Sequence, residues 1–122
     1  MPNTEILWSD KPKDHDYPAA ESYLELLYDR PTVKKYIRGM MKAPISKFKA
    51  KDIFRASKEP LLDGRNGHVA KDIKRIRTDQ KLSPILLVRD PTFRKVIIAD
   101  GYHRLCAVYS FDEDAWVSCK IV

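Results

Sequence analysis

Residues 96–107 read Val-Ile-Ile-Ala-Asp-Gly-Tyr-His-Arg-Leu-Cys-Ala, and this stretch decides the fold. Its apolar half predicts a strand, the Asp-Gly pair ends that strand, and a helix is expected from Gly101 to about Ser110. The free N–H groups and the dipole of a helix N-terminus attract anions. His103 and Arg104 add an imidazole and a planar guanidinium to the first turn. The turn is therefore typical of a phosphate site.

Two further residues of this turn have more than one interpretation. Asp100 either caps the helix by accepting a hydrogen bond from the N–H of His103, or serves as a metal contact or a general base. Gly101 permits a close approach of the backbone or a positive φ.

A basic flank is expected on the helix predicted from His68 to about Asp79. At 100° per residue its apolar residues face the core, and His68, Lys71 and Arg75 cluster beside that apolar stripe. These three side chains are close enough to bind one polyphosphate, although a solvated helix face gives the same pattern. We expect them to form the second wall of the phosphate site.

The composition is that of a soluble globular domain. The chain has 122 residues, a formal net charge of +6, 43% hydrophobic and 33% charged residues. No apolar run reaches the roughly 20 residues that span a bilayer, and Met1–Lys13 lacks the layout of a signal peptide. We therefore expect a cytoplasmic protein with anionic partners and no membrane association. The two cysteines are expected to be buried free thiols, and no zinc set is present.

The chain divides into two predicted parts, residues 1–44 and 45–122. The first comprises an extended arm over 1–16 and a hairpin of helices over 18–28 and 31–42. In the second, Ile53-Phe54 is interpreted as a strand end or turn, and a loop over 63–67 precedes the basic helix. Strands are expected over 85–89 and 95–99, paired as a hairpin, and over 116–122.

The helix over 31–42 carries a second basic face, formed by Lys34, Lys35, Arg38 and Lys42. This face is interpreted either as a solvated outer surface or as a nucleic-acid surface. No stacking array or base-contact motif accompanies it.

The order of predicted elements over 45–122, with Leu-Ser-Pro-Ile before one strand and Asp-Gly-Tyr-His-Arg-Leu-Cys-Ala after the next, resembles the ParB/sulfiredoxin superfamily. The resemblance implies an α+β fold with a small mixed sheet and packed helices, preceded here by the N-terminal helical hairpin. ParB proteins carry Gly-Glu-Arg-Arg and bind CTP, sulfiredoxins carry Gly-Cys-His-Arg and bind ATP, and free-serine kinases carry Asp-Gly-His-His-Arg. Residues 100–104 are most similar to the kinase version.

The resemblance also implies roles for individual residues. His103 and Arg104 would contact nucleotide phosphates, His68 and Lys71 would complete the phosphate site, and Glu59 would be the catalytic base. Tyr102 occupies the position of the reactive cysteine of sulfiredoxins, so sulfiredoxin chemistry is not expected. Partition activity is not expected either, because no helix-turn-helix or dimerisation domain follows residue 122.

These observations lead to a predicted nucleotide-binding protein for ATP or CTP, with Mg²⁺, that is either an ATPase or a small-molecule phosphotransferase. The expected site residues are Glu59 and Asp100 for catalysis and His68, Lys71, Arg75, Gly101, His103 and Arg104 for the nucleotide. The alternatives are a nucleic-acid-binding or nuclease-like module, and an interaction domain that binds nucleotide without turnover. A homodimer is a further candidate assembly.

Overall fold

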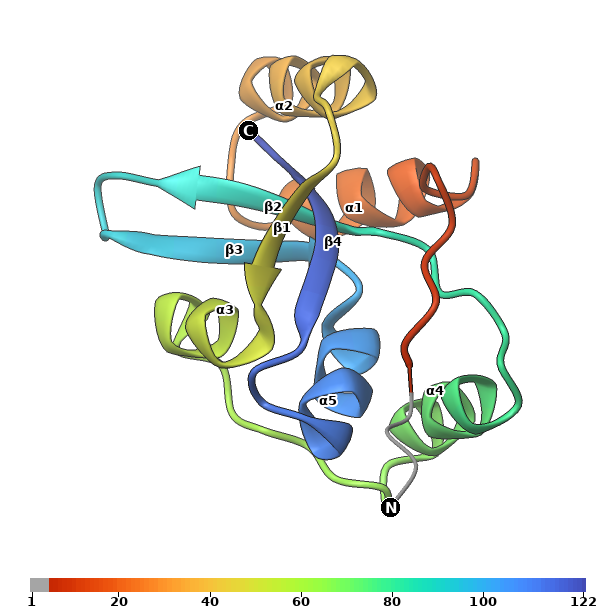
Figure 1. The fold of residues 1–122 in the computed structure, drawn as a ribbon. Helices are drawn as coiled ribbons and strands as arrows, with labels where there is room; N and C mark the ends of the chain where they lie inside the picture. Colours follow the sequence, from red (N-terminus) through yellow and green to blue (C-terminus); the bar gives the residue numbers. More distant parts are fainter. Residues whose placement is uncertain (1–4) are drawn as a thin grey trace.

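A computed structural model describes residues 5–122, which form an α+β fold around a four-stranded sheet (Figure 1). The elements in chain order are α1 (Asp16–Leu24), α2 (Arg30–Lys42), β1 (Ser46–Lys49), α3 (Ala50–Ser57), α4 (Gly67–Arg77), β2 (Ile85–Asp90), β3 (Lys95–Asp100), α5 (Tyr102–Phe111) and β4 (Trp116–Ile121). The strand order is β1-β4-β2-β3. The pairs β1–β4 and β2–β3 are antiparallel, whereas β2 and β4 are parallel. The predicted α+β class and the β2–β3 hairpin are confirmed.

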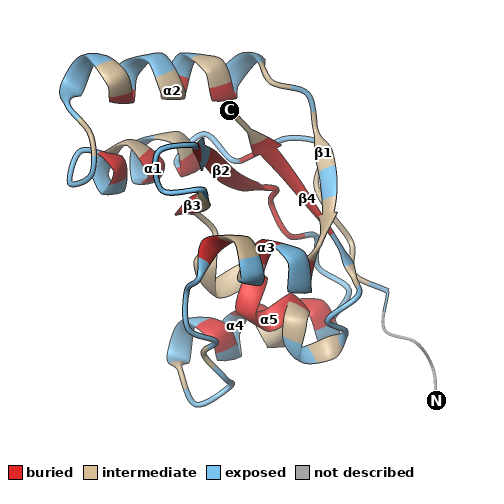
Figure 2. Ribbon diagram, turned by 90° about the vertical axis from the view of Figure 1, so that its left-hand side faces the viewer, coloured by how far each residue is buried: buried red, intermediate tan, exposed pale blue. Residues whose placement is uncertain are grey.

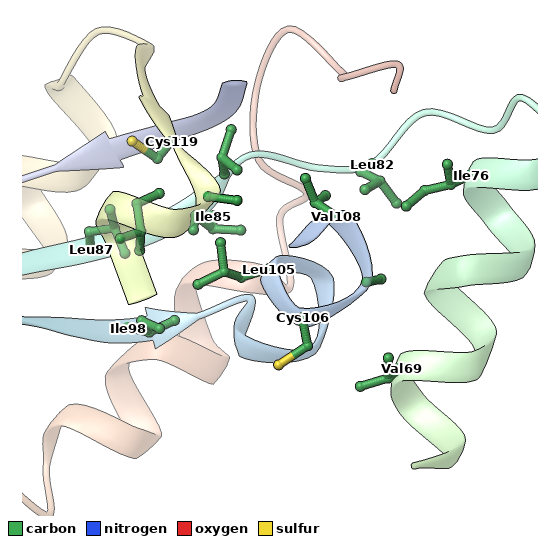
Figure 3. Packing of buried hydrophobic residues seen from close by; sticks show 14 residues of the cluster. Val69, Ile76, Leu82, Ile85, Leu87, Ile98, Leu105, Cys106, Val108 and Cys119 are labelled. Atoms are coloured by element: carbon green, nitrogen blue, oxygen red, sulfur yellow. The ribbon is translucent and has the colours of Figure 1, made fainter. Parts of the chain in front are cut away.

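The sheet is covered on both faces. Leu86 and Val88 of β2 pack against α1 and α2, while Ile85 and Leu87 face the core beneath α3 and α5 (Figures 1 and 3). A strand that is buried on both faces needs apolar residues at successive positions rather than at alternate ones. This requirement explains the unbroken apolar runs of β2 and β3.

The helical hairpin of α1 and α2 shares a core with the sheet. Val33, Ile37 and Met40 of α2 are buried in the same cluster as the sheet residues. Lys120 of β4 is also buried, and its Nζ donates a hydrogen bond of 3.2 Å to the carbonyl of Met41 at the end of α2. The same ammonium lies 5.9 Å from the ring centroid of Tyr17 in α1. Both helices are therefore tied to the sheet.

Two local predictions are wrong. Ile53-Phe54 is neither a strand end nor a turn, because it lies within α3, where Ala50, Ile53 and Ser57 are buried at helical spacing. The first helix covers residues 16–24 rather than 18–28, and the chain turns from Glu25 onward. Strand β1 was not predicted from the sequence; it is only four residues long and pairs on one side.

The described part of the N-terminal arm is only partly as predicted, because Trp8 forms a β-bridge with Leu82 whereas the chain turns at residues 14–15 and α1 begins at Asp16, within the predicted arm. The N–H of Ser9 donates to the carbonyl of Leu82 at 2.8 Å, and the N–H of Leu82 donates to the carbonyl of Leu7 at 2.8 Å. The first four residues of the predicted arm lie outside the described residues. Within residues 5–122, no helix has the length and apolar character needed to cross a membrane.

Candidate functional site

Gly101 shapes the turn between β3 and α5. Its φ is +106°, a conformation that favours glycine, and it is the N-cap residue of α5. A Cβ at this position would lie 2.7 Å from Nη2 of Arg104 and would overlap the side chain of Ile85. The predicted positive φ is confirmed, and the turn tolerates no side chain here.

Arg104 lies in a buried network of carboxylates. Its Nη2 donates to Oδ2 of Asp100 at 2.8 Å, and its Nη1 donates to Oγ of Ser83 at 2.7 Å. Ser83 in turn donates to Oδ2 of Asp16 at 2.7 Å, and Oδ1 of Asp16 lies 3.7 Å from Nη1 of Arg104. Only 16% of the Arg104 side chain and 3% of the Asp16 side chain are exposed. The guanidinium thus joins the start of α1 to the turn.

Asp100 does not cap α5. Its carboxylate accepts from Arg104, and Gly101 provides no side-chain cap. Among residues 5–122, the backbone N–H groups of Tyr102, His103 and Arg104 therefore form no hydrogen bond. The capping interpretation is wrong because the opposite charge of Arg104, one helical turn further on, competes for the same carboxylate. The first turn of α5 is left with unsatisfied donors, as an anion-binding helix end requires.

A hollow of about 270 Å³, here called the basic hollow, lies between α4 and the turn. It is lined by His68, Lys71, Asp72, Arg75, Asp100, Gly101, His103 and Arg104. The structure thus brings together all six residues predicted to bind phosphate. In α4, Val69 and Ile76 are buried whereas His68, Lys71 and Arg75 are exposed, as the helical periodicity predicted.

The cations of the basic hollow differ in their partners. Nη1 of Arg75 lies 2.6 Å from Oδ1 of the buried Asp72, and Arg104 is paired with Asp100. Lys71 forms no salt bridge with any residue from 5 to 122. Its ammonium is consequently the cation of this hollow that is most available to an incoming anion.

A second hollow of about 320 Å³, the tyrosine hollow, adjoins the first and shares Asp100, Gly101 and His103 with it. The rest of its lining consists of Tyr23 of α1, Glu59, Ile98 and Ala99 of β3, and Tyr102. The hydroxyl of Tyr102 donates to the carbonyl of Pro60, which fastens the segment that follows α3 to α5. The predicted catalytic residues Glu59 and Asp100 therefore line the same hollow.

Electrostatics distinguish the two carboxylates. Burial raises the pKa of Asp100 above its usual range, although the charge of Arg104 opposes this shift. Glu59 is exposed; burial raises the pKa of Tyr23, and the charge of Glu59 adds to this shift. Glu59 is thus the carboxylate of the tyrosine hollow that faces solvent, and Asp100 is the one held by an internal cation.

The imidazoles of His68 and His103 face each other across the basic hollow, with ring centroids 4.8 Å apart. Burial and the neighbouring His68 lower the pKa of His103 below its usual value near 6.5, and Asp72 partly opposes them. At neutral pH this ring is uncharged, so it donates a single N–H until an anion favours its protonation.

The described residues do not form a metal centre of their own. Among residues 5–122, no group of three His, Cys, Asp or Glu side chains is placed to hold an ion. Of the carboxylates that line the two hollows, Asp72 and Asp100 are paired with arginines, and Glu59 is the one that forms no salt bridge with residues 5–122. This donor set fits a Mg²⁺ ion that arrives on phosphates and meets one or two protein carboxylates. Cys106 and Cys119 are buried free thiols, as predicted.

Several site residues were not found from the sequence. Asp16 and Ser83 lie far from Arg104 along the chain, and no periodicity relates them. Tyr23 lies on the first predicted helix, and the sequence predicted no role for it. Asp72 could have been recognised, because it lies three residues before Arg75 on a helix, a spacing that favours an ion pair.

Three comparisons with known proteins gave no relative. No family model, no curated protein and no solved structure matches the chain.

We expect Gly101→Ala to destabilise the protein by at least about 2 kcal/mol, because backbone strain adds to the overlap with Ile85. Gly67→Ala is the matched control, since nothing lies within 4 Å of a Cβ there. The free energy of unfolding, measured in urea, checks both variants. Equal stabilities for the two variants would contradict the proposed constraint on the turn.

Anion binding at the basic hollow is expected to strengthen as the pH falls from 7.5 to about 5.5, since His103 titrates below its usual value. An anion stabilises the protonated ring, so affinity grows as the pH falls through that lowered pKa. Sulfate is the probe because it remains dianionic throughout, and calorimetry measures its affinity. His103→Gln should weaken the dependence, with His68 still present in the hollow, whereas His15→Gln, whose side chain is 78% exposed and outside both hollows, should preserve it.

Proposed function

We propose that this chain binds a nucleoside triphosphate, ATP or CTP, with its phosphates in the basic hollow. One observation carries the proposal: α4 and the first turn of α5 present Lys71, Arg75, His68 and His103 around one hollow. The first turn of α5, whose N–H groups at residues 102–104 are unsatisfied, contributes His103 and Arg104 to the lining of that hollow. Backbone donors, a helix dipole and a free ammonium together form a setting that suits a polyphosphate better than a single carboxylate.

The residues of the basic hollow would act on the phosphates in two ways. Lys71 and the N–H groups of the first turn of α5 would bind the phosphates directly, with His68 and His103 as further donors. Arg75 and Arg104 would add positive charge while they remain paired with Asp72 and Asp100. Because both terminal nitrogens of Arg104 already donate to Ser83 and Asp100, its contribution would be mainly electrostatic.

The tyrosine hollow would contain the groups that react with the nucleotide. A nucleotide whose phosphates lie in the basic hollow would direct its terminal phosphate toward the residues shared by both hollows. Glu59 is then the candidate base that would deprotonate a water or a small hydroxylated acceptor. The ion pair with Arg104 would hold Asp100 in position beside it. Mg²⁺ would neutralise phosphate charge, with Glu59 as the available carboxylate.

We also propose that residues 45–122 adopt the ParB/sulfiredoxin-like arrangement that the sequence resembles. The mixed sheet, the β2–β3 hairpin and the helix that opens directly after Asp100-Gly101 support this proposal. The N-terminal hairpin lies outside the resemblance, yet through Tyr23 it forms part of the tyrosine hollow.

Calorimetric titration with ATP, CTP and GTP, with and without Mg²⁺, tests the function. We expect binding of ATP or CTP, and an affinity about tenfold or more weaker in Lys71→Ala, because a charge-assisted hydrogen bond is removed. Lys74→Ala is the matched control, an exposed lysine of the same helix that lines neither hollow. The absence of heat at about 1 mM nucleotide would contradict the proposal. Phosphate release in wild type and Glu59→Gln then separates an enzyme from a domain that only binds.

A second candidate function rests on a separate surface. The side chains of Lys34, Lys35, Arg38 and Lys42 are all exposed on the outer face of α2. This face lies on the opposite side of the sheet from α4 and α5 (Figure 1). A row of cations on a helix suits the phosphates of a nucleic acid, and the alternative of a nucleic-acid-binding module is proposed for this surface.

A gel shift over a range of salt concentrations tests this alternative. If α2 binds nucleic acid, Lys34→Glu with Lys35→Glu should weaken binding and lower the slope of affinity against salt by about 1 for each phosphate that the helix no longer neutralises. Lys74→Glu with Lys81→Glu makes the same charge change on other elements and should leave binding close to wild type. Unchanged binding by the α2 variant would exclude this helix as the surface.

A further inference from the structure

One end of the sheet is left uncovered on the face that carries α3. This helix has only eight residues, and beyond it lies an apolar groove of about 200 Å³. Each strand contributes one apolar side chain to the groove, namely Phe48, Leu87, Val96 and Ile121. The groove therefore crosses the whole sheet, at the end where β3 begins rather than where it ends at Asp100.

The rim of this groove is predominantly basic. Asp52 is the acidic residue in its lining, and Oδ1 of Asp52 lies 4.0 Å from Nη2 of Arg55. A wider hollow of about 520 Å³ continues from the groove and shares Arg89 and Val96 with it. Arg94 and Lys95 of the β2–β3 hairpin lie on the same rim. Arg89 and Arg94 are exposed and Lys95 is half-buried, and none forms a salt bridge with another residue of 5–122. An occupant with apolar and acidic side chains would complement this surface.

The turn between α1 and α2 has that complementary composition. Leu26 is 82% exposed and Leu27 is 47% exposed. Glu25 and Asp29 are both exposed, and these two residues flank the two leucines; an N-capping bond from Thr32 lowers the pKa of Asp29. These residues, 25–29, are called the acidic knob. They form an apolar protrusion with negative charge on either side.

The acidic knob and the groove occupy the same end of the molecule. The hydroxyl of Tyr28 donates to Oδ2 of Asp90 at 2.9 Å, which ties the knob to the hairpin that carries the basic rim. Figure 2 faces this end and shows the turn between α1 and α2 beside β2 and β3, with α3 below them. A protrusion and a complementary groove that adjoin on one surface are what a two-fold interface needs, because each copy then supplies both halves.

We propose that two copies of this chain associate through this end, with the acidic knob of each copy in the basic-rimmed groove of the other. Burial of Leu26 and Leu27 against the groove supplies the apolar contact, and the charges on either side fix the orientation. The pairing closes, so it gives a dimer rather than a filament. The basic hollow lies at the opposite end of β3, outside this contact. This inference is independent of the proposed function.

Analytical ultracentrifugation of the whole chain tests the proposal. Wild type should sediment as a dimer at about 100 µM, above the Kd of a standard interface, and Leu26→Asp should sediment as a monomer. Leu61→Asp is the matched control, because Leu61 is 52% exposed on the loop before α4, and it should remain dimeric. A monomeric wild type, or a dimeric Leu26→Asp, would overturn the proposal.

A charge exchange tests the pairing itself. Glu25→Lys and the double variant Arg94→Glu with Lys95→Glu should each dissociate, since like charges then meet at both contacts. Their equimolar mixture should form a heterodimer, because the lysine of one copy meets the glutamates of the other at one contact and the wild-type charges meet at the second. Circular dichroism confirms that each variant is folded. Persistent monomers in the mixture would overturn the proposed contact even if wild type is a dimer.

Discussion

The buried network of Asp16, Ser83, Arg104 and Asp100 is the interaction on which the site depends. It joins the start of α1, the approach to β2, the end of β3 and the first turn of α5 through one guanidinium. Removing one member would leave a buried charge without its partner, which typically costs about 3–5 kcal/mol. The N-terminal hairpin is therefore part of the site's support, and its packing on the sheet and the geometry of the turn depend on each other.

The sheet gives this network a rigid base. Because both faces of β2 and β3 are buried, neither strand can shift its register without moving apolar side chains toward the opposite layer. The turn at Gly101 is fixed at one end of β3, and the basic-rimmed groove is fixed at the other. One short hairpin thus places two surfaces of different chemistry at a constant separation.

The sequence predicted those features that are encoded among near neighbours. Apolar runs marked β2 and β3, Asp100-Gly101 marked the break, and helical periodicity placed Lys71 and Arg75 on one exposed face. The ion pair of Arg104 with Asp16 could not be predicted in this way, because it joins the first helix to the last and follows no sequence periodicity. Ile53 was misassigned because a β-branched residue beside an aromatic one is typical of strands, whereas burial of one face of α3 decided the outcome.

The difference between local sequence patterns and long-range contacts also changes the interpretation of Arg104. From residue type alone, an arginine in the first turn of a helix is a phosphate ligand, but here both of its terminal nitrogens already donate to internal partners. A phosphate beside the first turn of α5 would face the carboxylate of Asp100 in the same hollow. The ion pair with Arg104 cancels that negative charge, in surroundings where burial strengthens electrostatic interactions. In the proposed site, Arg104 would favour an anion at this turn without touching it. Direct contact would fall to Lys71, which forms no salt bridge among residues 5–122, and to the unsatisfied backbone N–H groups.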